Sequence, residues 1–524
     1  MRVAALDLGS NSFHLLVVDA SADGHFVPLA RDKETLRLGD MVSREGRITE
    51  AGAAKAIATI QRFKSQADGL GATELMACAT SAIRDAENGG EVIDAIYAAT
   101  GVRVTLLSGI EEARLIFQAV RASVVIDPGP ALCLDLGGGS LEVMVGGPQG
   151  LLRAATLPLG VGRLTTELVR DDPPSADDIR RLRERLTATI APVAEEMASF
   201  RPTMTVATSG TLSDLARMAL ARRTGVVPAS LNQVTVTREE IEALHADIMA
   251  ATVAQRTKMA GLEARRADQM PAGSMVAVVA MELFGIRELT MSAWAMREGI
   301  VLEVIGRADP ALWTSDAHAI RRSSVLGLAR RCNWDEAHSR HVTRLALDLF
   351  DATTKLHGLG PDERELLDHA ALLHDIGTHV AHESHHKHTA YLIQHGKLRG
   401  YDPEQVDALA CLARYHRRGE PKPSHEPFNT LNPELQDQVT KLAALLRIAD
   451  GLDLSHTGAV TAVHVDIDKS RVRIDLSGSG DLQMELWGAR RKRQLFEKVF
   501  DRRLEFAIAR AGVDRADRAD RKAG

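Results

Sequence analysis

The fold follows from Leu6-Asp7-Leu8-Gly9-Ser10-Asn11-Ser12 and from a second copy of this segment 128 residues further on, Leu134-Asp135-Leu136-Gly137-Gly138-Gly139-Ser140. Apolar residues occupy every second position after each copy: Phe13, Leu15 and Val17 after the first, Leu141, Val143 and Val145 after the second. This period directly after a glycine turn indicates a strand, a tight turn and a second strand. A P-loop or a dinucleotide-binding fingerprint needs a helix after the glycines, so both are excluded. The repeat predicts two related lobes, each opening with a β-hairpin, that face each other across a cleft.

Glycine turns of this kind suit an anion, because backbone N–H groups can approach it closely where no Cβ intervenes. One such turn fits a plain tight hairpin equally well, but two copies with Asp and Ser in register favour phosphate. Asp7 and Asp135 end the preceding strands, where a carboxylate can hold Mg²⁺ against that phosphate. A third turn, residues 208–211, precedes a helix at Leu212, whose N-terminus adds partial positive charge. The predicted phosphate contacts are Ser10, Asn11, Ser12, Gly137, Gly138, Gly139, Ser140, Ser209, Gly210 and Thr211.

A candidate general base lies in Ser108-Gly109-Ile110-Glu111-Glu112. Ser108 and Glu111 have the spacing of a capping box, so the segment predicts a helix start and assigns Glu111 to the cap. Glu112 has no role in that box, and the dipole at a helix start favours an ionised carboxylate. Arg84 follows a predicted strand, where a surface ion pair is the usual fate of a single arginine.

Histidines mark a second part of the chain, since 16 of the 19 lie after residue 305. Gly306-Arg307-Ala308-Asp309-Pro310 ends a helical stretch and sets the main boundary. Apolar spacing then predicts a helical bundle over 335–350, 363–374, 403–416 and 434–452. After Gly458 the alternation predicts short strands of a small α/β appendix, including residues 482–486, with a helix over 494–500. The tail from residue 511 has almost no apolar residues and is predicted to be disordered.

Composition limits the class of protein. Of 524 residues, 45% are apolar and 26% charged, which excludes wholesale disorder, collagen and coiled coil. The net charge of −6 provides no general basic field, and aromatic residues do not alternate with the basic runs, so we expect neither nucleic acid nor membrane as a partner. Four widely separated cysteines fit neither a disulfide framework nor a zinc site. No signal peptide or spanning segment is recognisable, so a cytoplasmic location is expected.

Together these segments resemble the ordered motifs of the exopolyphosphatase / guanosine pentaphosphate phosphohydrolase (Ppx/GppA) family, over roughly residues 1–305. Further matches are residues 79–88, 157–165, 266–273 and 297–299. The resemblance implies an α/β, two-lobed actin/sugar-kinase-like (ribonuclease H-like) fold with catalysis between the lobes. It also implies that Glu112 is the catalytic residue that activates water, that Arg84 contacts phosphate, and that Asp7, Asp135 and Glu142 bind Mg²⁺. A homodimer is implied as well.

In the second part, His341, the pair His374-Asp375 and Asp450 resemble the H…HD…D metal ligands of HD-domain phosphohydrolases, as in the long members of that family. Such ligands suit Mn²⁺, Fe²⁺ or Mg²⁺. Residues 382–388 and 414–416 offer further ligands or polyanion contacts. Whether this site turns over substrate, or is a degenerate or structural site, stays open. The expected domains are lobe I (1–124), lobe II (125–306), an all-α HD-type domain (307–457), the appendix (458–510) and the tail (511–524).

The leading hypothesis is a Mg²⁺-dependent exopolyphosphatase that removes terminal phosphate from inorganic polyphosphate. Basic residues Arg414, His416, Arg417, Arg418 and Lys422 favour a track for a long anion, whereas residues 490–493 fit a solvated face. A guanosine pentaphosphate (pppGpp) 5′-phosphohydrolase would use the same Glu112. A hypothesis of another class is a non-catalytic polyphosphate or nucleotide sensor. A sugar kinase ranks last, because no sugar pocket is recognisable.

Overall fold

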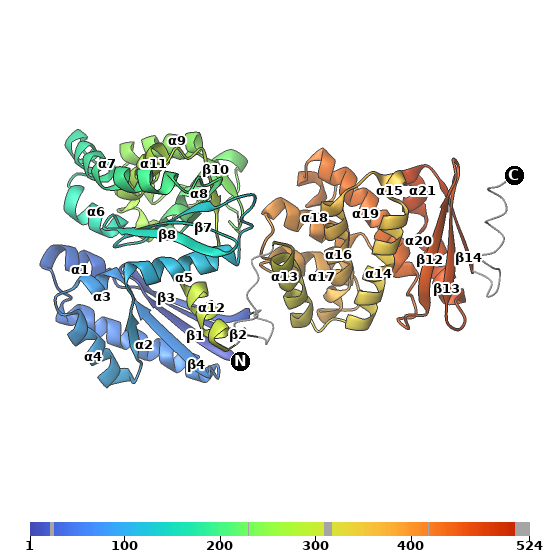
Figure 1. Cartoon of the computed structure of the whole chain (residues 1–524), viewed down its shortest axis with the longest axis horizontal. Helices are drawn as coiled ribbons and strands as arrows, with labels where there is room; N and C mark the ends of the chain where they lie inside the picture. The colour runs from blue at the N-terminus through green and yellow to red at the C-terminus, as the bar shows by residue number, and fades with distance from the viewer. Residues whose placement is uncertain (21–25, 229, 309–316, 418, 509–524) are drawn as a thin grey trace. The chain divides into compact units, whose positions relative to one another are not determined.

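The computed structural model describes residues 1–20, 26–228, 230–308, 317–417 and 419–508. The chain divides into two compact units: unit 1 is Met1–Ser323 with Arg399–Pro403, and unit 2 is Ser324–Leu398 with Glu404–Gly524. Figure 1 shows both. The end of the predicted boundary segment, Asp309 and Pro310, and the predicted tail from residue 511 lie outside the described residues.

Unit 1 contains two mixed sheets with one strand order. The first runs β3-β2-β1-β4-β5, and the second runs β8-β7-β6-β9-β11 with β10 added at its edge. In each sheet the first three strands of this order are antiparallel to their neighbours. The strand that follows them, β4 in the first sheet and β9 in the second, runs parallel to β1 or β6, the first strand of the hairpin. The duplication that the glycine segments predict is therefore present in the topology. The strands are β1 (Arg2–Leu8), β2 (Ser12–Ala20), β3 (Phe26–Thr35), β4 (Glu74–Ala79), β5 (Val104–Leu106), β6 (Ala131–Leu136), β7 (Leu141–Gly147), β8 (Gly150–Leu157), β9 (Met204–Thr208), β10 (Thr235–Thr237) and β11 (Glu288–Met291).

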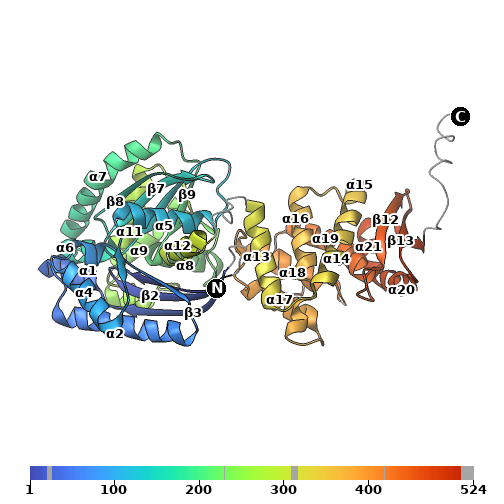
Figure 2. The same cartoon turned by 60° about the horizontal axis from the view of Figure 1, so that its bottom comes forward.

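Helices cover the outer faces of both sheets and fill the space between them. The first sheet has α2 and α4 outside, the second has α7, α8, α9 and α11 outside, and α5 and α12 lie between the sheets in both views (Figures 1 and 2). The helices of unit 1 are α1 (Leu38–Glu45), α2 (Glu50–Gly69), α3 (Ser81–Asp85), α4 (Gly89–Thr100), α5 (Gly109–Arg121), α6 (Val161–Leu168), α7 (Ala176–Ala198), α8 (Gly210–Thr224), α9 (Arg238–Ala250), α10 (Val253–Arg256), α11 (Met270–Leu283) and α12 (Met296–Ala308). Helix α13 (Ala317–Arg331) follows.

Strand alternation assigns each side chain to one of these layers. Along β1, Ala4 and Leu6 join the outer core, while Val3 and Ala5 join the core between the sheets. Along β6, the leucines at 132, 134 and 136 face outward and Cys133 faces inward. The inner core also receives apolar residues of α5 and α12, so a single apolar layer joins the two lobes. Because side chains alternate with period two, the next inward-facing residue is Asp7 on β1 and Asp135 on β6.

Unit 2 is a helical bundle followed by a small three-stranded sheet. The four helices expected from apolar spacing are confirmed as α14 (Glu336–Ala352), α16 (Pro361–Leu373), α18 (Pro403–Arg414) and α19 (Pro433–Gly451). The remaining α-helices and strands are α15 (Thr354–His357), α17 (His385–His395), α20 (Gln483–Lys492), α21 (Gln494–Phe500), β12 (Val460–Ile467), β13 (Arg471–Gly478) and β14 (Arg503–Ile508), and two 3-10 helices are η3 (Ile376–His379) and η4 (Phe428–Thr430).

One element of the appendix differs from the expectation. Residues 482–486 lie in α20 and its N-cap rather than in a strand. Leu482, Leu486 and Ala489 are buried with helical spacing, whereas Met484 is exposed. Two leucines four residues apart fit either period, so the alternation alone was ambiguous. The third strand of the sheet is β14, which pairs in parallel with β13.

In the described part of the chain no helix combines the length and the apolar character needed to cross a membrane. The four cysteines are buried, and none is disulfide-bonded.

The contact between α12 and α5 depends on a glycine. A Cβ placed at Gly299 would lie 2.1 Å from the carbonyl oxygen of Leu115. We predict that Gly299→Ala costs roughly 1–3 kcal/mol through overpacking and lowers the melting temperature of unit 1 by roughly 2–6 °C, measured by scanning calorimetry. The control is Gly90→Ala in α4, where an added Cβ meets no atom within 4 Å. Equal melting temperatures for the two variants would contradict this packing.

Candidate functional site

Three carboxylates end the strands that face the inner core of unit 1. Asp7 continues the inward series of β1, Asp135 that of β6, and Glu142, the second residue of β7, lies on the same face as Met144. The register of the second hairpin places Asp135 directly opposite Glu142, and the first hairpin pairs Asp7 with His14 at the same position. Like charges directly opposite each other on a sheet are destabilising. The pair therefore requires a proton or a cation.

Glu112 joins this group from the first turn of α5. The predicted capping box is confirmed, with Ser108 and Glu111 exchanging hydrogen bonds, so Glu111 stays at the surface. Glu112 is instead buried, with 7% of its surface exposed. Arg84 Nη1 lies 3.3 Å from its Oε2 and also donates to the carbonyl of Leu107 at 2.8 Å. Arg84 thus makes a buried ion pair with Glu112 and holds its carboxylate in place.

Burial dominates the electrostatics of the four carboxylates. It raises the pKa of Asp7 to about 6, and burial together with the charge of Asp7 raises the pKa of Asp135 to about 7. Burial also raises the pKa of Glu112 to about 8, although Arg84 opposes the shift. The pKa of Glu142 lies well above its ordinary value because of burial and the charges of Glu112 and Asp135. Shifts of this kind, gathered at strand ends, are typical of a functional site.

The unsatisfied atoms at this position fit a hard cation. Asp135 Oδ1 and both carboxylate oxygens of Glu142 are buried without a hydrogen-bond partner. Carboxylate oxygens are the ligands that Mg²⁺ prefers. The donor set therefore agrees with the Mg²⁺ expected from the sequence.

The two glycine turns pack against each other beside the carboxylates. A Cβ at Gly139 would lie 2.1 Å from Ser81 Oγ and 2.7 Å from Ser10 Oγ, and one at Gly138 would lie 2.9 Å from Asn11 Cβ. In the second turn Gly137 N–H donates to the carbonyl of Ser140 at 2.9 Å. Only glycine allows this approach.

The side chains of the first turn contact protein groups. Ser10 Oγ accepts from the N–H of Ala82 at 3.0 Å and lies 2.6 Å from Ser81 Oγ, which fixes the start of the helix that carries Arg84. Asn11 donates to Gln269, and the hydroxyl of Ser12 lies 3.3 Å from that of Thr35. Their contact with phosphate stays a prediction.

The third turn lies on the strand next to Asp135. Thr208, the last residue of β9, is paired with Asp135 in the sheet register. Ser209 has a φ of 100°, a rare value for a residue with a Cβ, and its hydroxyl accepts from the N–H of Leu212 at 3.2 Å. The guanidinium of Arg266 lies where a Cβ of Gly210 would be. Arg266 is ion-paired with Asp214 at 3.3 Å and with Glu263 at 2.8 Å, so the contact of this turn with phosphate stays a prediction.

In unit 2, three of the four predicted metal ligands are brought together, but His341 is not. His338, one turn earlier on α14, lies with His374 and Asp450, their donor atoms all within 4.8 Å of one another. His338 belongs to the buried stripe with Val342, Leu345 and Leu349, while His341 is half-buried on another side of α14, beside Arg344. This stripe is visible in the sequence and indicates which histidine points inward.

Further histidines extend the cluster, and the exposed His456 forms a group of donors with His338 and Asp375. Asp375, His385 and His416 form a second group of donors within 4.8 Å of one another. The segments 382–388 and 414–416, expected to offer further ligands, thus contribute one ring each.

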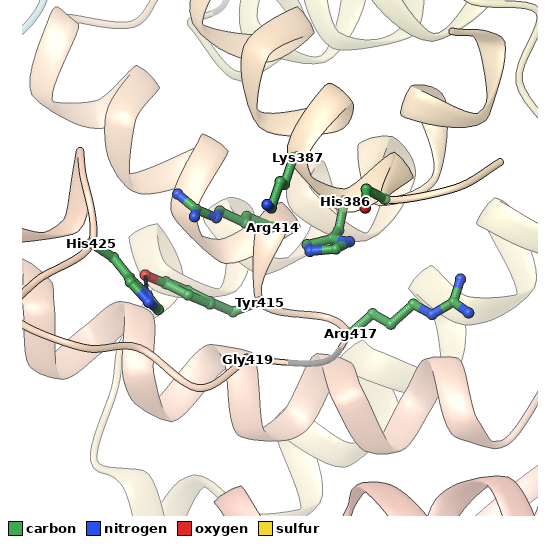
Figure 3. Close-up of a pocket in the computed structure, with 8 residues that line it drawn as sticks. His386, Lys387, Arg414, Tyr415, Arg417, Gly419 and His425 are labelled. Atoms are coloured by element: carbon green, nitrogen blue, oxygen red, sulfur yellow. Dashed lines mark hydrogen bonds between the residues drawn. The ribbon is translucent and has the colours of Figure 1, made fainter. Parts of the chain in front are cut away.

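The residues that directly flank His385 and His416 in the sequence line a cavity of about 350 Å³, whose wall is drawn in Figure 3. It is lined by Ser384, His386, Lys387, Arg414, Tyr415, Arg417, Gly419 and His425. Of the predicted basic track, Arg414 and Arg417 line it, and Arg418 lies outside the described residues. Three of the lining side chains are cationic and none is acidic, so the cavity suits an anion.

Comparison with known proteins agrees with this two-lobed, phosphate-handling class. Residues 17–308 match the model of the Ppx/GppA phosphatase family, and residues 320–485 match Ppx/GppA phosphatase, domain III. The chain therefore belongs to the Ppx/GppA phosphatase family and is an enzyme of that family.

Two of the relatives differ in their names and in how much of this chain they match. Exopolyphosphatase 1 of Mycobacterium tuberculosis is 42% identical over 306 residues, which are 58% of this chain and 88% of that protein. A guanosine-5′-triphosphate,3′-diphosphate pyrophosphatase of Aeromonas hydrophila is 26% identical over 475 residues, 90% of this chain and 92% of that protein. Among solved structures, an exopolyphosphatase from Cytophaga hutchinsonii has a TM-score of 0.55 at 26% identity and covers 59% of this chain and 98% of its own.

The raised carboxyl pKa values predict how stability depends on pH. Between about pH 4 and 8 these carboxyl groups bind more protons in the folded protein than in the unfolded chain, so without divalent cations they lower the melting temperature of unit 1 as pH rises through this range. Mg²⁺ should raise it more at pH 8 than at pH 5, because its ligands must be deprotonated. Calorimetry of wild type and Asp135→Asn measures this, and the variant should show the shallower pH slope. Equal gains from Mg²⁺ at both pH values would contradict the site.

Proposed function

We propose that this chain is an exopolyphosphatase that hydrolyses the terminal phosphate of inorganic polyphosphate. The observation that supports it best is the buried Glu112–Arg84 pair beside Asp7, Asp135 and Glu142, where the two glycine turns meet. The 42% identity to proteins named exopolyphosphatase favours this substrate. Buried carboxylates at the ends of strands, next to turns that admit an anion, are groups suited to phosphoryl transfer to water.

In the proposed mechanism Glu112 orients the attacking water and takes its proton. Burial raises the pKa of Glu112, so the carboxylate, once it is ionised, is a stronger base than an exposed glutamate. Arg84 keeps the carboxylate in position through the 3.3 Å contact and presents positive charge to the phosphoryl group. The N–H groups of the glycine turns and of residues 209–211 hold the phosphate chain. Mg²⁺, held by Asp7, Asp135 and Glu142, supplies neutralisation of phosphate charge.

A pppGpp 5′-phosphohydrolase is the second candidate. The relative named guanosine-5′-triphosphate,3′-diphosphate pyrophosphatase covers 90% of the chain, including most of unit 2, whereas the exopolyphosphatase relatives match 58%. Both substrates end in a phosphoanhydride, so the same Glu112 would serve either. The proposal further includes an HD-type helical domain within unit 2, the domain limits set out from the sequence, a homodimer and a cytoplasmic location.

Replacement of Glu112 tests the general base. We predict that Glu112→Gln lowers kcat for phosphate release by about 10²–10⁴-fold with little change in KM, since a positioned base typically contributes that much. Glu111→Gln is the matched control, because the carboxylate of Glu111, next to Glu112 in the sequence, only caps the helix at the surface. This substitution should change the rate less than threefold. If Glu112→Gln keeps more than about a tenth of the wild-type rate, Glu112 is not the base.

Initial rates on two substrates test the substrate class. Long-chain polyphosphate and pppGpp are compared with Mg²⁺ at matched concentrations, and we expect polyphosphate to be hydrolysed at least tenfold faster, which is about 1.4 kcal/mol of transition-state binding. The opposite preference would establish the pppGpp phosphohydrolase instead. If phosphate is released from neither substrate, the result would favour the hypothesis of a non-catalytic sensor.

A further inference from the structure

Arg163 on α6 connects the second glycine turn, residues 137–140, with the helix that carries Arg84. Its Nε donates to the carbonyl of Gly139 at 3.2 Å, and its Nη2 lies 2.6 Å from Asp85 Oδ2. Helix α6 follows β8 of the second sheet, whereas α3, with Arg84 and Asp85 at its end, follows β4 of the first sheet. The side chain of Arg163 therefore bridges the two halves of unit 1 at this turn.

The start of α6 holds the backbone of the same turn. The N–H of Val161 donates to the carbonyl of Gly137 at 3.0 Å, and the N–H of Gly162 donates to the carbonyl of Gly138 at 2.9 Å. These N–H groups are ones that the start of a helix leaves without an intrahelical partner. Together with the side chain of Arg163, α6 thus binds three successive carbonyls of the turn.

The three bonded carbonyls fix the direction of the amides in the turn. In a planar trans peptide the C=O and the N–H point in opposite directions, so the N–H groups of Gly138, Gly139 and Ser140 are directed away from α6. Gly160 makes the close approach of α6 possible, since a Cβ there would lie 2.2 Å from the carbonyl carbon of Gly139. Successive amides aimed to one side are suited to bind an anion. In the proposed function these amides hold phosphate.

Asp85 joins this contact to Arg84. One carboxylate oxygen, Oδ2, faces Arg163, and the other, Oδ1, lies 3.7 Å from Nε of Arg84. Through Nη1 the guanidinium of Arg84 contacts Glu112 Oε2 at 3.3 Å and the carbonyl of Leu107 at 2.8 Å. Among the described residues, Nη2 of Arg84 donates to no protein group. Two carboxylates thus hold the guanidinium, and Nη2 is left for a phosphoryl oxygen.

We propose that Arg163 and Asp85 are positioning residues for phosphoryl transfer, each acting through another group. Arg163 aims the amides of the second turn, Asp85 aims the guanidinium of Arg84, and the contact between the two ties both to one geometry. The two halves of unit 1 then act on the same phosphoryl group, next to Glu112. Groups that are oriented before the reaction need no rearrangement during it. This inference rests on the roles that the proposed function gives to Glu112 and Arg84.

The exposure of the pair separates this role from a structural one. The side chains of Arg163 and Asp85 are 24% and 38% exposed. An ion pair so close to solvent contributes little to folding. Misplacement of a catalytic group by about 1 Å, in contrast, can lower a rate about 10²-fold. Loss of the pair should therefore reduce the rate far more than the stability.

Kinetics of the full chain with Mg²⁺ test the proposal, on whichever of polyphosphate and pppGpp the wild type hydrolyses faster. We expect Arg163→Ala and the isosteric Asp85→Asn each to lower kcat by about 10–100-fold, with KM changed less than about threefold. The melting temperature should fall by less than about 3 °C in each.

A double variant and a chemical rescue distinguish positioning from damage to the fold. Arg163→Ala with Asp85→Asn should be no slower than the slower single variant, because either change breaks the same connection. Millimolar guanidinium chloride should restore part of the rate of Arg163→Ala and leave that of Asp85→Asn unchanged. A misfolded protein would show neither effect.

Arg37→Ala is the matched control. Arg37 pairs with Asp268 at 2.9 Å across the same two halves of unit 1, and the two side chains are 35% and 37% exposed. Its guanidinium also donates to the carbonyl of Arg265, and none of these contacts involves Arg84 or the second turn. The kcat of Arg37→Ala should therefore stay within about threefold of the wild-type value.

Three results would overturn the proposal: a wild-type kcat in Arg163→Ala, an equal loss in Arg37→Ala, or additive losses in the double variant. Glu112→Gln, measured beside them, keeps this failure distinct from failure of the proposed function. A rate that survives Glu112→Gln contradicts the proposed function. A rate that is lost in Glu112→Gln but kept in Arg163→Ala contradicts the positioning alone.

Discussion

Burial of four carboxylates between two sheets is the constraint on which unit 1 depends. Asp7, Asp135, Glu142 and Glu112 share one region, and burial raises the pKa of each. An apolar core of this kind is normally intolerant of charge. The arrangement is stable only when the carboxyl groups are protonated at low pH or when a cation neutralises them at neutral pH. Glu112 can accept a proton only when the cation is present. The stability of unit 1 and its chemistry therefore have the same electrostatic origin.

The duplicated topology explains how these groups meet. Each hairpin presents a strand end and a glycine turn, and α5 lies between the two sheets with Glu112 in its first turn. The turns touch because Gly138 and Gly139 have no Cβ, so the ends of β1 and β6 come together. Neither lobe alone collects the full set of carboxylates. Unit 2 uses a different solution, in which helix ends supply imidazoles whose outer nitrogens are held by oxygen atoms.

Much of this could be predicted from local patterns. The hairpins, the capping box at Ser108, the four long helices and α21 follow from periodicity and spacing, which are properties of short segments. The strand expected at 482–486 was wrong, since Leu482 and Leu486 satisfy the helical period equally well. The burial of the Arg84–Glu112 pair required the inner core, which is a tertiary property. The sequence predicted His341 as a metal ligand, whereas the rotation of α14, set by Val342 and Leu345, brings His338 to the other donors instead.

The most direct test of the central claim is the anomalous diffraction of a crystal of the protein grown with Mn²⁺ in place of Mg²⁺. The account predicts an anomalous peak in contact with Asp135 and Glu142, within reach of Asp7, because their unsatisfied buried oxygens require a cation. A well-ordered unit 1 with no peak at these carboxylates would contradict it, since the charges would then have to be neutralised by protons alone.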